Sequence, residues 1–164
     1  MPPGFPAADP RLILRPEELD GALEQFLLAE AALWMAADPA LEGEPHKLGR
    51  GHFRAAFLLK RRPGIGGQDL ARLTGLSKQG SSRVLKDLIG AGYAEIVVNE
   101  EDARRRPTRL TEAGAAFEAR VAERMRGHLS LAFRDGGLDA VLGARRIMAA
   151  VAGPRAIRRS GGGA

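Results

Sequence analysis

The feature that most constrains the fold of this chain is a glycine turn between two short segments with apolar faces, residues 68–73 and 77–90. Gly75 stands between them, where the backbone needs a left-handed conformation that glycine adopts without steric cost. Ser77 follows as a suitable N-cap, because its hydroxyl can accept a hydrogen bond from a free amide of the next turn. The pattern predicts a helix–turn–helix. The apolar face of its second segment consists of Val84, Leu85 and Leu88.

The hydrophobic period changes directly after this motif. The segment 93–98 is short and rich in β-branched side chains, which is typical of a strand. Residues 108–110 can form a second strand after a charged loop. Helical periodicity covers most of the remaining chain. The expected helices span residues 16–38, 47–61, 112 to about 128 or beyond, and 138–151, and the first is expected to break at Pro39.

This order of elements predicts a mainly α-helical fold with a small β-wing. The fold class is a winged helix–turn–helix with N- and C-terminal dimerisation helices. The expected regions are an N-terminal arm and dimerisation helix (1–45), a DNA-binding domain (46–111), C-terminal dimerisation helices (112–155) and a flexible tail (156–164).

The polar face of the segment 77–90 has the composition of a helix that reads DNA. Gln79, Ser82, Arg83 and Lys86 fall at i, i+3, i+4 and i+7, so they share one side of a helix. Glutamine can contact adenine and arginine can contact guanine through two hydrogen bonds in the major groove. A merely solvated polar face is the alternative. The candidate DNA-binding residues of this helix are Ser77, Lys78, Gln79, Ser81, Ser82, Arg83 and Lys86.

The loop between the two expected strands is a second candidate DNA contact. Arg104, Arg105 and Arg106 are consecutive cations at its tip. Such a tip can enter the minor groove or straddle phosphates, where negative potential is concentrated. Asp102 can accept a hydrogen bond from the Arg104 guanidinium and fix its direction. Taken alone, the cluster also fits an ordinary exposed loop.

The distribution of charge agrees with a nucleic-acid partner. The net charge of +5 divides into −7 for residues 1–45, +8 for residues 46–111 and +4 for residues 112–164. A basic middle segment suggests a surface that faces a polyanion. A solvated arginine-rich surface, or a basic face that binds an acidic protein without reading a DNA sequence, remains an alternative.

Several function classes have no support in the sequence. The chain has no cysteine, which excludes disulfides and thiol redox switches. No apolar run reaches about 18 residues and the N-terminus lacks a secretory pattern, so we expect a cytoplasmic protein without a membrane span. No nucleophile–base pair, phosphate loop or metal triad is discernible, so we expect no catalytic residue, metal or cofactor.

A series of short motifs runs from Leu48 to about Gly114. They are Pro63-Gly64, Asp69-Leu70-Ala71, Gly75-Leu76-Ser77, Ser82-Arg83-Val84-Leu85, Leu88, Gly92, Asp102-x-Arg104 and Leu110-Thr111-Glu112-Ala113-Gly114. With these motifs the chain resembles the MarR family of winged-helix regulators. The resemblance implies an obligate homodimer that grips a pseudo-palindromic site. It also implies a repressor that a small anionic or phenolic ligand, an oxidant or a metal releases from DNA.

The chain departs from the family pattern in its recognition helix and wing. Gly80 and Ser81 stand where threonine and an apolar residue are common, and Gly66-Gly67 replaces the usual capping residue of the preceding helix. Pro107 and Thr108 make the returning strand less apolar than usual. These positions put the stiffness of the recognition helix and the length of the wing in question.

The flanking helices carry more apolar side chains than one small winged domain can cover. We therefore expect them to bury against a second copy, which places two recognition helices roughly 34 Å apart. Packing within the same chain is the alternative. The candidate dimerisation residues are Leu23, Phe26, Leu27, Leu138, Leu142 and Ile147, together with Trp34.

A small-molecule effector is a further candidate partner. Aromatic walls with a few polar groups suit a planar anion, although aromatic residues at helical spacing also fit an ordinary core. His46 and His52 lack the i, i+4 spacing of two metal ligands on one helical face, and His128 is remote. The candidate pocket residues are Trp34, His46, His52, Phe53, Arg54, Phe57 and Phe117.

Overall fold

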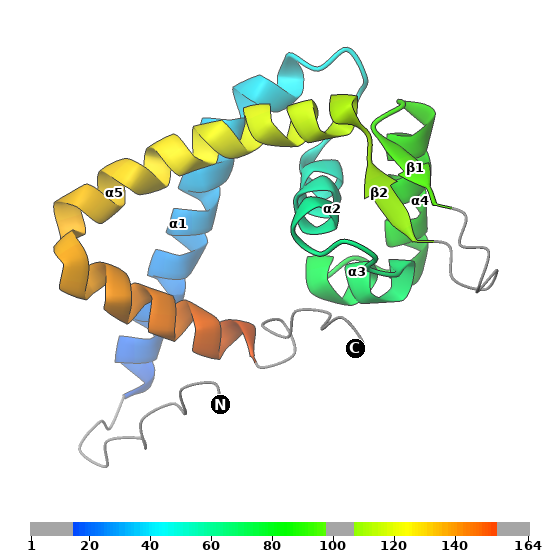
Figure 1. Cartoon of the computed structure of the whole chain (residues 1–164). Coiled ribbons are helices and arrows are strands. Elements are labelled where there is room, and N and C mark those ends of the chain that lie inside the picture. The colour runs from blue at the N-terminus through cyan, green and yellow to red at the C-terminus, as the bar shows by residue number, and fades with distance from the viewer. Residues whose placement is uncertain (1–14, 98–106, 154–164) are drawn as a thin grey trace, which may run out of the picture.

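The computed structural model describes residues 15–97 and 107–153 (Figure 1). It confirms a mainly helical winged-helix fold with one small antiparallel sheet. Within the described residues no helix is both long and apolar enough to cross a bilayer. The elements are α1 (Pro16–Glu42), α2 (Arg50–Arg61), α3 (Gly67–Thr74), α4 (Lys78–Gly90), β1 (Ala94–Ile96), β2 (Thr108–Leu110) and α5 (Glu112–Ala152).

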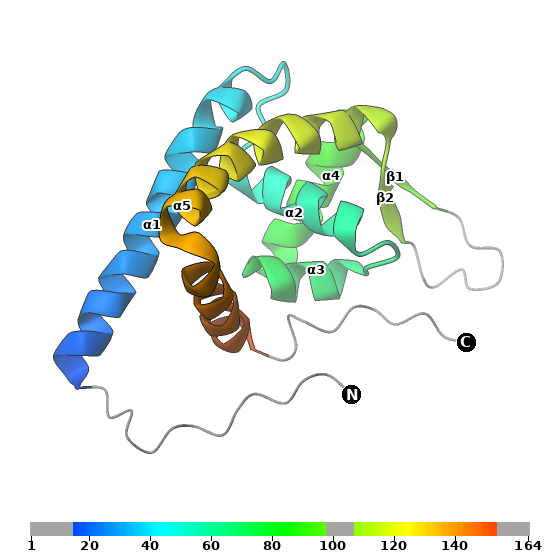
Figure 2. The same ribbon diagram turned by 60° about the vertical axis from the view of Figure 1, so that its left-hand side comes forward.

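Two long arms extend from a small winged unit. Helices α2, α3 and α4 and the β1–β2 hairpin form the winged unit, while α1 and α5 cross and extend away from it (Figures 1 and 2). Helix α5 bends at Gly137, whose φ of 74° and ψ of 175° are not helical. The second half of α5 then runs in a sharply different direction from its first half (Figures 1 and 2). The prediction of two C-terminal helices is confirmed, with the break at this glycine.

The end of α1 corrects one sequence prediction. The helix continues through Pro39 to Glu42, so the expected break at Pro39 is wrong. Proline removes one amide donor, but the Gly43 amide still donates to the Pro39 carbonyl at 3.2 Å. Leu41 is buried, and the Asp38 carboxylate accepts two hydrogen bonds from Arg50 of α2, at 2.6 and 3.1 Å. These contacts hold the last turn of α1 in place.

One hydrophobic core joins the winged unit to the arms. Phe117 and Val121 of α5 are fully buried and belong to the same cluster as Leu70 of α3 and Leu88 of α4. Trp34 of α1 is also part of this core and packs edge-on against Phe53 of α2, with ring centroids 6.0 Å apart. Trp34 is therefore buried by its own chain, which corrects the expectation that it contacts a second subunit.

The predicted turn and cap of the helix–turn–helix are confirmed. Gly75 ends α3 in the left-handed conformation, with φ 71° and ψ 9°. The Ser77 hydroxyl accepts a hydrogen bond from the Gly80 amide at 3.0 Å and starts α4. This geometry fixes the direction in which α4 leaves α3, and thereby which of its faces meets solvent.

The wing is attached to α5 through a close backbone contact. Strands β1 and β2 are antiparallel, with Ala94 opposite Leu110. Thr111 caps α5 by accepting from the Gly114 amide at 3.1 Å, and its hydroxyl donates to the Gly92 carbonyl at 2.7 Å. A Cβ on Gly114 would lie 1.8 Å from the Tyr93 carbonyl oxygen. Only glycine fits at that position without moving the backbone.

Candidate nucleic-acid interface

The outer face of α4 is polar and open to solvent. Gln79, Ser82, Arg83 and Lys86 are all exposed, and the Arg83 side chain is 85% accessible. Val84 and Leu88 on the opposite face are buried in the core. The four polar residues predicted to share a stripe therefore lie together on the surface. Ser77 and Lys78 are exposed at the first turn of the same helix.

Ser81 does not belong to this stripe. It is 1% exposed, and its hydroxyl donates to the Gly67 carbonyl of α3 at 3.3 Å. The spacing explains the error, because Ser81, Val84 and Leu88 stand at i, i+3 and i+7 and so share the buried face. The structure therefore corrects the DNA-binding assignment of Ser81, which joins α4 to the start of α3.

An ion pair that the sequence analysis missed lies beside Arg83. The Asp87 carboxylate is 4.0 Å from Arg83 Nε, one turn along α4. The same carboxylate oxygen is 3.2 Å from His52 Nε2 of α2. His52 Nδ1 accepts from the Gly49 amide at 2.9 Å, so Nε2 is the nitrogen that donates to Asp87. Asp87 thus places a negative charge beside the Arg83 guanidinium and is itself held by His52 of α2.

The described part of the wing carries one exposed ion pair. Arg109 Nε of β2 donates to Glu95 of β1 at 2.6 Å across the two strands. Thr108, expected to weaken the returning strand, is buried and pairs with Ile96. The wing residues predicted to contact DNA, Asp102, Arg104, Arg105 and Arg106, lie outside the described residues.

An aromatic pocket of about 640 Å³ lies where α1, α2 and α3 meet. Trp34, Phe53, Arg54 and Phe57, four of the seven predicted pocket residues, line it together with Arg72 and Thr74 of α3. That the pocket binds a ligand stays a prediction. The Arg54 guanidinium lies 5.2 Å from the centroid of the Trp34 ring and donates to Glu30 at 2.6 Å. The pocket thus offers aromatic walls and two guanidinium groups.

The other three predicted pocket residues lie elsewhere. His52 faces Asp87 of α4, as described above. His46 packs edge-on against Tyr93, with ring centroids 5.4 Å apart. Phe117 lies inside the core, where its ring also stacks on Tyr93, with ring centroids 5.3 Å apart. Of the predicted pocket residues, Trp34 and Phe53 belong to both the core and the pocket, whereas Phe117 belongs to the core and does not line the pocket.

Tyr93 is also part of a polar contact between the wing and the arms. Its hydroxyl donates to the Glu44 carboxylate at 2.8 Å, and Arg120 of α5 donates to the same carboxylate at 2.6 Å. Burial, and next the hydrogen bond to Glu44, raise the pKa of Tyr93, so its phenol stays a donor near neutral pH. The hydrogen bond to Glu44 likewise raises the pKa of Arg120.

The arms expose a large amount of apolar surface. The predicted dimerisation side chains on the first half of α1 and on the second half of α5 face solvent. These exposed residues are Leu23, Phe26, Leu27, Leu138, Leu142 and Ile147.

The helix–turn–helix, the exposed polar stripe on α4 and the two-stranded wing define the class of winged-helix DNA-binding proteins. A family model described as "MarR family" matches residues 46–105. A curated relative, the HTH-type transcriptional regulator PetP of Rhodobacter capsulatus, is 35% identical over 156 residues, which cover 95% of this chain and 92% of PetP. The chain belongs to the MarR family of transcriptional regulators.

Solved structures share the fold. NadR in complex with 4-hydroxyphenylacetate has a TM-score of 0.69 and 21% identity, covering 79% of this chain and 91% of NadR. RV1404 of Mycobacterium tuberculosis has a TM-score of 0.66 and 20% identity, covering 79% and 92%. MarR of Staphylococcus aureus, in complex with salicylate and kanamycin, has a TM-score of 0.66 and 14% identity, covering 83% and 91%.

Proposed function

We propose that two copies of this chain form a symmetric dimer that binds a pseudo-palindromic DNA site and represses transcription in the cytoplasm. The observation that carries the proposal is the polar stripe of α4. Gln79, Ser82, Arg83 and Lys86 point away from the core that the same helix helps to form. A helix presented in this way can enter the major groove and offer hydrogen-bonding groups to base edges.

The charge of the DNA-binding region supports the same interface. Residues 46–111 carry a net charge of +8. Lys78 and Lys86 at the two ends of the stripe are suited to phosphate contacts, and the wing tip with Arg104 is proposed to reach the neighbouring minor groove. Because phosphate contacts release counterions, affinity for DNA should fall as salt is added.

Dimerisation is supported by the apolar arms. Monomeric soluble proteins rarely leave large apolar patches in contact with water. The exposed leucines and phenylalanine of α1, and the exposed leucines and isoleucine of α5, would be covered if the arms of two copies packed together. A two-fold axis between them would place the two α4 helices about one turn of duplex apart.

The aromatic pocket is the proposed effector site, and its proposed ligand is a planar aromatic anion. Trp34, Phe53 and Phe57 can pack against a ring. Arg54 and Arg72 donate to Glu30 and Asp69 in this structure, and a ligand carboxylate would replace these exposed carboxylates as their acceptor. NadR and Staphylococcus aureus MarR were solved with 4-hydroxyphenylacetate and salicylate, which are anions of this kind. Gly75 of the turn also lines the pocket, so a bound ligand would press on the link between α3 and α4.

Selection from a random duplex library, repeated at several salt concentrations, tests the proposed function. We expect an enriched palindrome with half-site centres about 10 base pairs apart and an affinity that falls steeply with salt. Binding without any sequence preference would contradict operator recognition. It would favour the alternative, in which the basic face serves as a protein-interaction module.

A further inference from the structure

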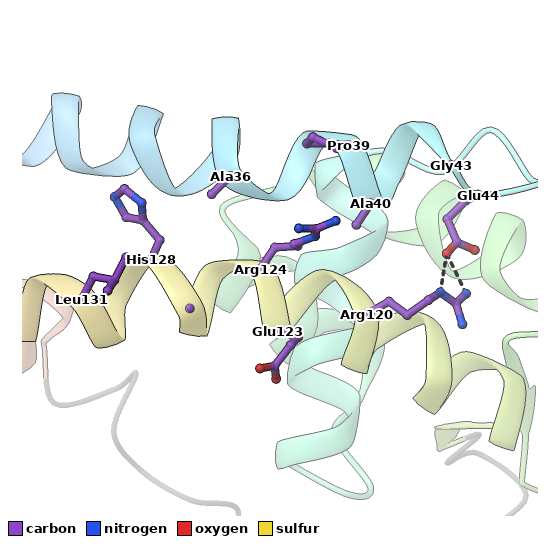
Figure 3. A pocket seen from close by; sticks show the side chains of 11 residues that line it. Ala36, Pro39, Ala40, Gly43, Glu44, Arg120, Glu123, Arg124, His128 and Leu131 are labelled. Carbon is purple, nitrogen blue, oxygen red and sulfur yellow. Dashed lines mark hydrogen bonds and ion pairs between the residues drawn. The ribbon is translucent and has the colours of Figure 1, made fainter.

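Besides the aromatic pocket, the structure has a groove between α1 and α5 (Figure 3). The groove and the pocket share no lining residue. Its volume is about 880 Å³. The α1 wall consists of the small residues Ala36 and Ala40 together with Pro39. The α5 wall carries three nitrogen-bearing side chains, each one turn after the last: Arg120, Arg124 and His128.

One end of this groove is fixed by an ion pair. Arg120 donates from Nη2 and Nε to the same oxygen of Glu44, at 2.6 and 3.0 Å. The Glu44 side chain is only 3% exposed, and its other oxygen accepts from Tyr93. Glu44 is thus occupied by two donors of its own chain and is not available to Arg124 or His128 further along α5.

Arg124 and His128 have no acidic partner in the part of the chain that the structure describes. Neither makes a hydrogen bond or ion pair there. The adjacent carboxylate, Glu123, accepts from Arg126 at 2.8 Å. Figure 3 shows Arg124 and His128 reaching toward α1, whereas Glu123 points away from it. Arg124 and His128 are both exposed, so the groove has two solvated hydrogen-bond donors that a ligand can reach.

We propose that this groove binds a short-chain dicarboxylate. Arg124 and His128 stand one helical turn apart on α5 and both reach toward α1, so a ligand with two carboxylates can contact both side chains at once. The Arg124 guanidinium can hold one carboxylate through two parallel hydrogen bonds, and an imidazole N–H of His128 can donate to the other. The methylene groups of the ligand would lie against Ala36 and Ala40.

The chemistry of this groove separates it from the proposed effector site. The aromatic pocket has three ring-bearing walls suited to a flat ligand, whereas the groove wall on α1 is made of small aliphatic residues. An aliphatic dianion suits these walls better than an aromatic ring. No lining residue belongs to α4 or to the described part of the wing, so binding to the groove can be measured without DNA.

Isothermal titration of the full-length chain with succinate tests the proposal. We expect one saturable site per chain and, in NMR spectra, a shift of the His128 imidazole resonances on titration. Arg124→Gln should weaken binding by about tenfold or more, because it removes a charge-assisted hydrogen-bond pair. Arg126→Gln is the matched control: it removes a guanidinium from the same helix that pairs with Glu123 outside the groove, and should leave succinate affinity unchanged.

Acetate and inorganic phosphate, titrated separately, distinguish the ligand class. Both should bind more weakly than succinate. Phosphate binding as tightly as succinate would overturn the dicarboxylate assignment, and so would succinate binding that Arg124→Gln leaves unchanged or the absence of any saturable binding. The same preparations, tested on the selected duplex without added anion, report the proposed function separately, because loss of DNA binding there would not alter the succinate titration.

Discussion

Arg83 is the residue of α4 best placed to read a base. Its side chain reaches into solvent, and Asp87 stands one turn away to limit its directions. Arg83→Ala should reduce discrimination at one base pair of each half-site by about 1–3 kcal/mol. Competition between the selected duplex and single-base variants measures this effect. Lys86→Ala is the control, since loss of a phosphate contact should weaken binding to all sequences alike. Unchanged discrimination in Arg83→Ala would contradict base reading.

Asp87 is expected to act on DNA through Arg83 rather than by direct contact. Asp87→Asn removes the negative charge beside Arg83 while leaving an amide oxygen that can still accept from His52 Nε2. We expect tighter binding to non-specific duplex, because a charge that repels phosphate is lost, and a smaller ratio of specific to non-specific affinity. Fluorescence anisotropy on both duplexes measures the ratio. A ratio that stays at the wild-type value would rule out a positioning role.

For single residues, contacts between near neighbours in the sequence were predictable, whereas contacts between residues far apart in the sequence were not. The roles of Gly75 and Ser77 depend on neighbours within a few residues, so the sequence contained what was needed. His52 and Asp87 are 35 positions apart, and Glu44 and Arg120 are 76 apart. Charge pairs at such separations form only after the helices have packed. For the same reason the sequence pattern did not predict them.

Among the elements, the start of α5 is the most tightly constrained. Gly114→Ala would place a methyl group within 1.8 Å of the Tyr93 carbonyl oxygen, so the helix and the wing must separate. We expect the free energy of unfolding to fall by about 1–3 kcal/mol or more. Thermal or urea unfolding followed by circular dichroism measures the change.

Gly127→Ala provides the matched control on the same helix. A Cβ at Gly127 meets no atom within 4 Å, and the residue lies in the helix interior. The substitution should raise the free energy of unfolding by about 0.5–1 kcal/mol, because alanine loses less conformational entropy than glycine. Equal effects of the two substitutions would contradict the close contact between α5 and Tyr93.

Element types were predictable from periodicity, but their ends and partners depended on packing. The period of apolar residues identified every described helix, and the β-branched run identified β1. The end of α1 was missed, because proline chemistry favoured a stop there while contacts of Leu41 and Asp38 extend the helix. Four of seven proposed pocket residues lie together, since aromatic spacing alone does not distinguish a core from a cavity.

For the whole molecule, the arms are expected to decide the oligomeric state. Leu142→Glu places a charge on the exposed apolar face of α5 and should convert the dimer to a monomer, as measured by light scattering coupled to gel filtration. DNA affinity should fall with it. Ile96→Thr is the control, because Ile96 of β1 is 46% exposed and Leu142 is 42% exposed, yet Ile96 lies away from the arms. A wild-type chain that is already monomeric would contradict the proposed assembly.

The bend at Gly137 has a consequence for operator architecture. Its backbone angles lie in a region that other residues avoid, so the direction in which α5 returns is set by this one position. In the proposed dimer, that direction governs how the two copies meet and hence the span between their α4 helices. The number of base pairs that separates the two half-sites then depends partly on a glycine remote from the DNA. Variants at Gly137 would prefer operators with a different separation between half-sites.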